Sequence, residues 1–93
     1  MRRAARIDEN QTDIVKALRK AGYSVAITSG LGDGFPDLLV GVRGKNYLLE
    51  IKDGNKPPSA QKLTADQVKW HRIWKGHVAV IDSVESALKE IGI

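Results

Sequence analysis

The apolar residues of the N-terminal quarter recur at a spacing that predicts a helix. Between residues 8 and 21, apolar side chains such as Ile14 and Leu18 return every three or four positions, so one face of a helix would be buried. Asp8 stands where a helix N-cap is expected, and Gly22 stands where a helix of this length would end. The segment therefore predicts an amphipathic helix that packs on a core.

Strands are predicted by alternation and by short apolar runs. Residues 23–28 alternate between apolar and polar side chains, which is typical of a strand. Two further β-rich runs, 37–42 and 47–52, are joined by Gly44-Lys45-Asn46, and this spacing predicts a hairpin with its turn at 44–46. His77 is followed by the apolar run Val78-Ala79-Val80-Ile81, and residues 77–81 are predicted to form a buried strand.

Two more helices complete the predicted fold. Thr64 followed by Gln67 matches a capping box, and it opens a helix predicted to run to Lys75 and to end at Gly76. A short last helix is predicted to begin near residues 82–85. The order α-β-β-β-α-β-α predicts an α/β domain over residues 1–93, with a mixed sheet of about four strands flanked by helices.

Composition narrows the class of protein. The chain has 93 residues and no cysteine, so it is one small domain without a disulfide framework or a thiolate zinc site. It contains no apolar stretch long enough to span a membrane, and the basic N-terminus is not followed by the apolar segment of a secretory signal. We therefore expect a soluble protein of the cytoplasm with no membrane partner.

Positive charge is concentrated in the middle of the chain. Residues 43–75 carry eight basic and three acidic side chains, whereas residues 7–42 carry three basic and five acidic ones. A basic segment beside acidic positions suits a polyanion such as nucleic acid, although each single lysine is also explained as solvated surface. Lys56 and Lys62 follow the second hairpin strand closely enough to reach a substrate, and Arg2 and Arg3 either contact phosphates or belong to an unstructured terminus.

Three charged residues mark the point where the two hairpin strands meet. Asp37 opens the first strand, and after twelve intervening residues Glu50-Ile51-Lys52 closes the second. Alternation along the strand puts Glu50 and Lys52 on one face and the Ile51 side chain on the other, which leaves the Ile51 carbonyl available as an oxygen ligand. The alternative is an ordinary surface ion pair between Glu50 and Lys52.

This arrangement has the parts needed to hydrolyse a phosphodiester. Mg²⁺ or Mn²⁺ held by Asp37, Glu50 and the Ile51 carbonyl would neutralise charge at the phosphate and activate water. Lys52 would orient that water or stabilise the developing negative charge.

The same residues resemble a known family. Gly34-Phe35-Pro36-Asp37, Glu50-Ile51-Lys52 and the segment Leu63 to Gln67 are similar, in their order, to the motifs of the PD-(D/E)xK nucleases, and most of all to the VRR-NUC (virus-type replication–repair nuclease) domain. The resemblance implies a restriction-endonuclease-like core, a divalent metal and a DNA substrate. It makes Asp37 and Glu50 metal ligands, Lys52 the catalytic lysine and Gln67 an accessory active-site residue.

The family also carries an acidic residue on its first helix, which reaches the metal. Glu9 is the candidate here, but it lies about 180° around the helix from Leu18, whereas Gln11 lies on the apolar face. Either the helix starts irregularly, or Gln11 takes that place, or Glu9 is a solvent-facing acid of the first turn that the helix dipole favours.

The function predicted from these residues is a structure-specific, metal-dependent DNA endonuclease. Small members of the family are similar to archaeal Holliday-junction resolvases, so the expected substrate is a four-way junction or related branched DNA, cut by a homodimer. The alternatives are a non-catalytic nucleic-acid-binding module on the same fold, or the nuclease subunit of a larger complex. Trp70 and Trp74 either stack on exposed bases or belong to the core or to a dimer interface, and His71 and His77 are interpreted as structural.

Overall fold

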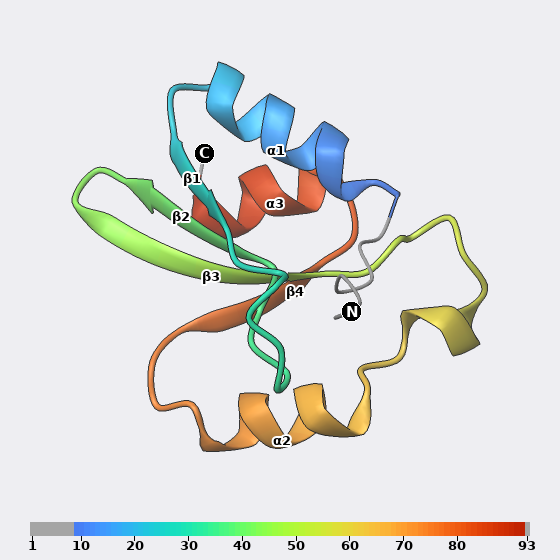
Figure 1. Cartoon of the computed structure of the whole chain (residues 1–93). Coiled ribbons are helices and arrows are strands. Elements are labelled where there is room, and N and C mark those ends of the chain that lie inside the picture. Colours follow the sequence, from blue (N-terminus) through green and yellow to red (C-terminus); the bar gives the residue numbers. More distant parts are fainter. Residues whose placement is uncertain (1–8, 93) are drawn as a thin grey trace.

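A four-stranded mixed sheet forms the centre of the molecule, with helices on both faces (Figure 1). The computed structural model describes residues 9–92. The strands β1 (Ser24–Ile27), β2 (Leu38–Val42), β3 (Lys45–Ile51) and β4 (Val78–Ile81) lie in that order across the sheet. The first three are antiparallel neighbours, and β4 runs parallel to β3 because the chain crosses over through a helix.

Two helices cover one face of this sheet. α1 (Gln11–Lys20) and α3 (Val84–Ile91) lie on the same side of the strands (Figure 1). Their apolar residues enclose the inward-facing residues of the strands and form the core. That core consists of Ile14, Val15, Leu18, Leu38, Val40, Leu49, Ile51, Ile81, Ala87 and Ile91.

Among the described residues, the helix on the other face is α2 (Ala65–Ile73), which follows a short 3₁₀ helix, η1 (Pro58–Gln61). The predicted capping box is present. The Thr64 hydroxyl accepts a hydrogen bond from the main-chain N–H of Gln67, and the side-chain oxygen of Gln67 accepts one from the main-chain N–H of Thr64. No residue of α2 is buried. This layer is therefore thin, and it leaves space between α2 and the sheet for a site.

The α/β fold and the order of elements predicted from the sequence are confirmed, but the first helix begins later than predicted. It starts at Gln11 with Asn10 as its N-cap, and Glu9 lies in the preceding turn. The Asn10 side chain does not cap the helix because its amide donates to the carbonyls of Lys52 and Asp82 instead. Asp8, the predicted cap, lies outside the described residues. Gly22 ends the helix in the left-handed conformation, as predicted (φ +95°).

The hairpin turn is also shifted from the predicted position at 44–46. Arg43 and Gly44 make a two-residue turn with positive φ at both positions (52° and 77°). Lys45 pairs with Val42 across the hairpin and so belongs to β3. Two successive left-handed residues match the right-handed twist of the strands, and this stabilises the shorter turn.

Two predictions of burial and length are wrong. The strand at 78–81 lies at the sheet edge, and Val80, which pairs with Glu50 and shares its face of the sheet, is 49% exposed. α2 ends at Ile73, since Trp74 adopts an extended backbone (ψ 125°), so the helix stops before Lys75 and Gly76. None of the described helices combines the length and the hydrophobicity that crossing a bilayer requires.

Candidate active site

The acidic residues of the hairpin meet at the end of the sheet where β2 begins and β3 ends. The Asp37 amide donates to the Leu49 carbonyl (3.0 Å), and one Asp37 carboxylate oxygen, Oδ2, accepts from the Ile51 amide (2.8 Å). The backbone therefore fixes the carboxylate of Asp37 beside the second strand. Glu50 is only 1% exposed, and it lies on the face of the sheet that α2 covers.

Gln67 connects the hairpin to α2. Its amide nitrogen Nε2 donates to Glu50 Oε2 (2.9 Å), and its oxygen Oε1 accepts from the Lys52 ammonium (2.9 Å). The same Oε1 accepts from the Thr64 amide (2.8 Å), so the capping residue and the active-site residue are one side chain. Because both ends of its amide are engaged, Gln67 holds Glu50 and Lys52 in a fixed relative position.

These residues surround one cavity of about 370 Å³. It contains most of the predicted site residues, from both the hairpin and the loop that follows it. The Ile51 side chain is in the core, so its main chain forms that part of the wall. The lining residues are Asp37, Glu50, Ile51, Lys52, Lys56, Ala60, Lys62, Thr64 and Gln67.

The donor groups at this cavity fit a hard divalent cation. In the part of the chain that the structure describes, no three His, Cys, Asp or Glu side chains gather as a metal site would require. Two carboxylates and the main chain of Ile51 nevertheless offer oxygen donors, and Mg²⁺ is commonly bound by one or two carboxylates, with waters and substrate phosphates completing its shell. The described residues that line the cavity include no histidine or cysteine, and such an oxygen donor set fits Mg²⁺ or Mn²⁺ better than zinc.

The first helix does not bring a carboxylate to this cavity. Glu9 is exposed in the turn before α1 and does not line the cavity. Gln11 is buried (3% exposed), and its Nε2 donates to the Ser29 hydroxyl (3.2 Å) while its Oε1 is buried without a hydrogen bond. Ser29 follows Thr28, whose amide donates to the Asp37 carbonyl (2.8 Å). Of the two residues, Gln11 is thus the one connected to the strand end that carries Asp37.

Two other residues near the site were not predicted to belong to it, and one of them, His71, was interpreted from the sequence as structural. The Asn10 side chain joins the carbonyls of Lys52 (3.3 Å) and Asp82 (3.1 Å), and so it holds the ends of β3 and β4 together. Its only signal in the sequence is its position just before a helix.

His71 lies one turn beyond Gln67, and its Nε2 is buried without a hydrogen bond to any described residue. Burial lowers the pKa of His71, and the charge of nearby Lys52 lowers it further, so this imidazole is neutral at pH 7.

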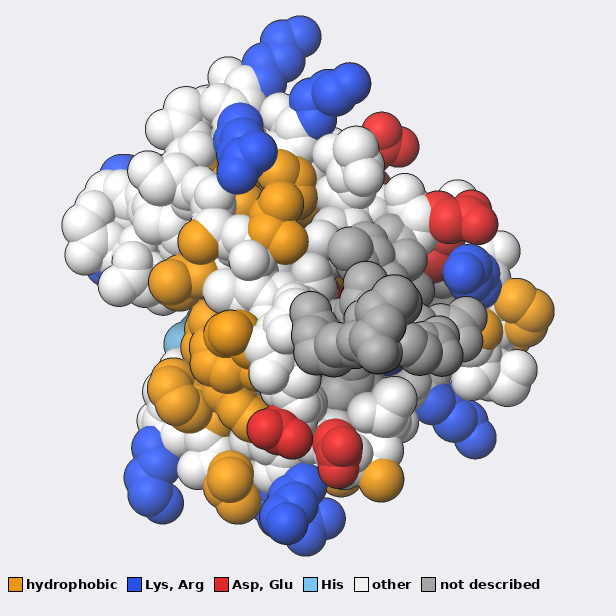
Figure 2. Space-filling model, in the orientation of Figure 1, with side chains coloured by type: hydrophobic (Ala, Val, Ile, Leu, Met, Phe, Trp, Pro, Cys, Tyr) orange, Lys and Arg blue, Asp and Glu red, His pale blue; other side chains and the backbone are white. Residues whose placement is uncertain are grey.

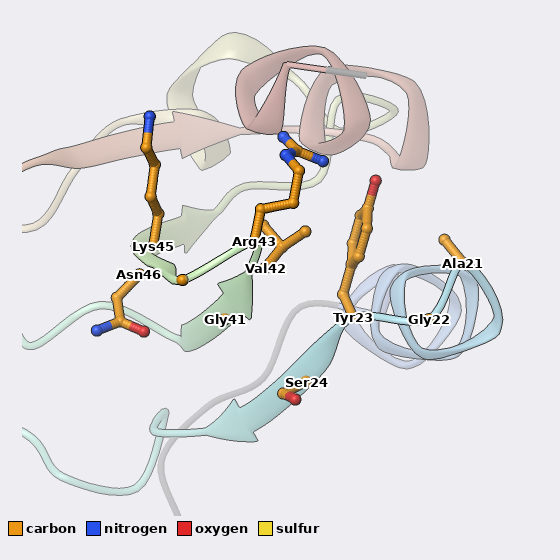
Figure 3. A pocket seen from close by; sticks show the side chains of 10 residues that line it. Ala21, Gly22, Tyr23, Ser24, Gly41, Val42, Arg43, Lys45 and Asn46 are labelled. Carbon is orange, nitrogen blue, oxygen red and sulfur yellow. The ribbon is translucent and has the colours of Figure 1, made fainter.

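A larger cavity, of about 610 Å³, lies at the opposite end of the sheet. Figure 3 shows it between the hairpin turn and the start of β1, with the side chains of Tyr23, Arg43 and Lys45 around it. No described residue that lines it carries a carboxylate, and Arg43 already donates to the carbonyl of Ile91 (3.1 Å). The smaller cavity therefore remains the candidate site, because the described residues that line it bring together acids, lysines and an amide. The predicted residues Arg2 and Arg3 lie outside the described residues.

Comparison with known proteins supports this fold. A solved structure described as a VRR_NUC domain superposes with a TM-score of 0.64 and 26% sequence identity, and the match covers 90% of this chain and 96% of that one. No protein-family model matches the sequence, and no curated protein matches it. The resemblance stated from the sequence motifs is thus confirmed by the structure.

Proposed function

Since this chain folds as a VRR-NUC domain, we propose that it is a divalent-metal-dependent DNA endonuclease that cuts four-way junctions or related branched DNA. One observation carries the proposal. Asp37, Glu50 and Lys52, which are separated by up to fifteen positions in the sequence, line a single cavity, and Gln67 bonds to two of them. An ordinary ion pair between Glu50 and Lys52 does not explain this arrangement. Burying a carboxylate is costly, and an ion pair returns little of that cost.

The two carboxylates have the role of holding the cation. Asp37, Glu50 and the Ile51 carbonyl would bind Mg²⁺ or Mn²⁺, which when bound supplies Lewis-acid stabilisation and a more acidic water. The Ile51 amide fixes one oxygen of Asp37, and Gln67 fixes one oxygen of Glu50, so neither carboxylate has to reorganise when the substrate binds. Glu9, from the turn before α1, or Gln11, from the first position of α1, would have to turn toward the cavity to complete this group.

Lys52 would place a positive charge beside the reacting phosphate. Its ammonium has three donors, and Gln67 Oε1 takes one of them at 2.9 Å. The remaining protons can donate to a phosphate oxygen or to the attacking water. Lys56 and Lys62, on the same cavity, would bind the flanking phosphates, and Arg2 and Arg3 would extend this basic surface.

We also propose that two copies act together on the junction. A domain of 93 residues offers limited area for holding a branched duplex, and a twofold dimer would present two such cavities to a substrate that is itself nearly twofold symmetric. Sedimentation of the protein with and without junction DNA measures this assembly directly.

Lys52→Met gives the test of the catalytic proposal. We expect cleavage of a labelled four-way junction to fall by about 10²- to 10³-fold, because a positioned charge is lost from the transition state. Binding of Mn²⁺ should stay within about threefold of the wild type, since Lys52 is not a metal ligand. Gln67 keeps its bond to Thr64 in this variant, so the fold should persist.

The assay compares junction, flap and plain duplex in Mg²⁺, in Mn²⁺ and in EDTA. Lys45→Met is the matched control, because Lys45 is exposed at the hairpin turn, at the other end of the sheet. Cleavage at wild-type rates by Lys52→Met would show that the wrong lysine is named. Tight junction binding by the wild type without cleavage under any condition would leave a binding module on a nuclease fold.

A further inference from the structure

Three aromatic rings lie one against the next, two of them stacked, in a row that starts beside the candidate active site and ends at a partly exposed ring. The Phe35 ring meets the edge of Trp70 (centroids 5.2 Å apart, planes at 69°), and Trp70 stacks on Trp74 (4.7 Å, 19°). Phe35 is two residues before Asp37, and Trp70 is one helical turn after Gln67. The two segments that carry these rings, the residues just before β2 and the helix α2, therefore also carry residues of the site.

The outer ring of this row is exposed to solvent, although Gly76 lies beside it near Nε1. Trp74 is 43% exposed even though one of its faces lies on Trp70, and α2 contributes no buried residue to the core. An exposed tryptophan does not contribute the large stabilising free energy that burial of its ring would provide. A ring left in this position is available to another flat apolar group.

Positive charge is concentrated on the segment that carries the exposed ring. Residues 62–75 contain four basic side chains and one acidic side chain, and Lys69, Arg72 and Lys75 are all exposed. In Figure 2, hydrophobic side chains gather in a band that reaches toward α2, and Lys and Arg side chains flank the α2 end of the molecule. Asp33 and Asp66 are the acids on this surface. Aromatic platforms beside cations are the means by which proteins bind single-stranded nucleic acid, through base stacking and phosphate contacts.

A second copy of the chain suits this surface less well. A twofold interface would place the same patch of each copy against the other. The basic side chains of residues 62–75 would then face their own copies, and like charges across an interface are costly. Charge complementarity therefore favours a polyanion as the occupant.

We propose that Trp74 stacks on an unpaired base of the bound DNA strand, and that the preferred substrate has unpaired nucleotides close to the cut phosphate. The distance from Gln67 to Trp74 along the helix is about 10 Å, from seven residues at about 1.5 Å each. That length spans about three stacked nucleotides at about 3.4 Å each. The position of the cut rests on the proposed function, but the binding of an unpaired base does not.

The test measures binding in EDTA, where no cleavage occurs. Fluorescence anisotropy is read with a labelled 20-nucleotide single strand, a flap with an unpaired arm, and a fully paired duplex. We expect Trp74→Ala to weaken binding to the strand and to the flap by about tenfold or more, and to leave duplex binding within about twofold. Trp74→Phe should restore most of the loss, because it keeps a ring.

Ile73→Ala is the matched control, since Ile73 is a more exposed apolar side chain (63%) on the same helix. It should change none of the three affinities. 2-Aminopurine placed about three nucleotides from the cut should be quenched by the wild type and not by Trp74→Ala. Circular dichroism and thermal melting of each variant establish that the fold is retained.

Equal losses on flap and duplex would overturn the inference. So would a wild-type dimer that Trp74→Ala converts to a monomer with flap and duplex affinities unchanged, because a second copy would then occupy the surface. If Trp74→Ala loses flap binding selectively and the wild type cuts nothing in Mg²⁺ or Mn²⁺, the inference stands and the nuclease proposal fails. If the wild type cuts in metal and Trp74→Ala binds the flap normally, only the inference fails.

Discussion

Glu50→Gln is expected to reduce cleavage in Mg²⁺ by about a thousandfold or more while leaving the fold intact. The substitution keeps the shape of the side chain, and its amide oxygen can still accept from Gln67 Nε2. It removes the negative charge that would hold the cation, and loss of several kcal/mol of transition-state stabilisation corresponds to a rate loss of this size. Single-turnover cleavage of a labelled junction measures the effect.

The stability of Glu50→Gln, unlike its activity, is expected to be unchanged or higher. Glu50 is 1% exposed, and a neutral amide costs less to bury than a carboxylate. In metal-free buffer, the melting temperature of Glu50→Gln should therefore equal or exceed that of the wild type.

Asp53→Asn serves as the control for Glu50→Gln. Asp53 is similarly buried (7% exposed), but its carboxylate accepts a local bond from the Asn55 amide and does not line the cavity. This variant should cut within about threefold of the wild type. A Glu50→Gln protein that cuts within tenfold of the wild type would remove Glu50 from the metal site.

Gly34→Ala is expected to lower both stability and cleavage, because the main chain of Gly34 lies directly against the main chain of α2. Its φ is +84°, and a Cβ added there would lie 2.6 Å from the Asp66 carbonyl carbon and 3.0 Å from the Gln67 nitrogen. No rotamer change can relieve a contact with main chain. The loop and the start of α2 must separate, and this displaces Gln67 from Glu50 and Lys52.

Gly32→Ala isolates the part of this effect that comes from the contact. Gly32 also has a positive φ (+78°), but a Cβ there would meet nothing within 4 Å. Gly32→Ala should cost only the left-handed backbone penalty, about 1 kcal/mol, and cut normally. Gly34→Ala should lose clearly more free energy of unfolding in urea, with at least a tenfold loss of cleavage. Equal effects of the two variants would show that the approach of the loop to α2 does not position the site.

Local patterns in the sequence predicted much of this structure. The capping box of Thr64 and Gln67, the helix end at Gly22 and the pairing of the two hairpin runs all depend on short-range chemistry, and each is found in the structure. The convergence of Asp37, Glu50 and Lys52 followed from alternation along the strands and from the hairpin, so its geometry could also be anticipated.

Long-range contacts explain what the sequence did not reveal. The late start of α1 reflects the bonds of Asn10 to carbonyls that are 42 and 72 positions away. The edge position of β4 depends on which strands lie beside it, and an apolar run such as Val78–Ile81 looks the same in the centre or at the edge of a sheet. The turn at Arg43 was not predicted because a bulky residue with positive φ is uncommon.

The most direct measurement is a crystal grown with Mn²⁺ and recorded at the manganese absorption edge. The proposed site predicts an anomalous peak in the cavity between Asp37, Glu50 and the Ile51 carbonyl, with Lys52 and Gln67 beside it. An empty cavity at saturating Mn²⁺, with the two carboxylates directed away from each other, would contradict the claim that these acids hold a catalytic cation.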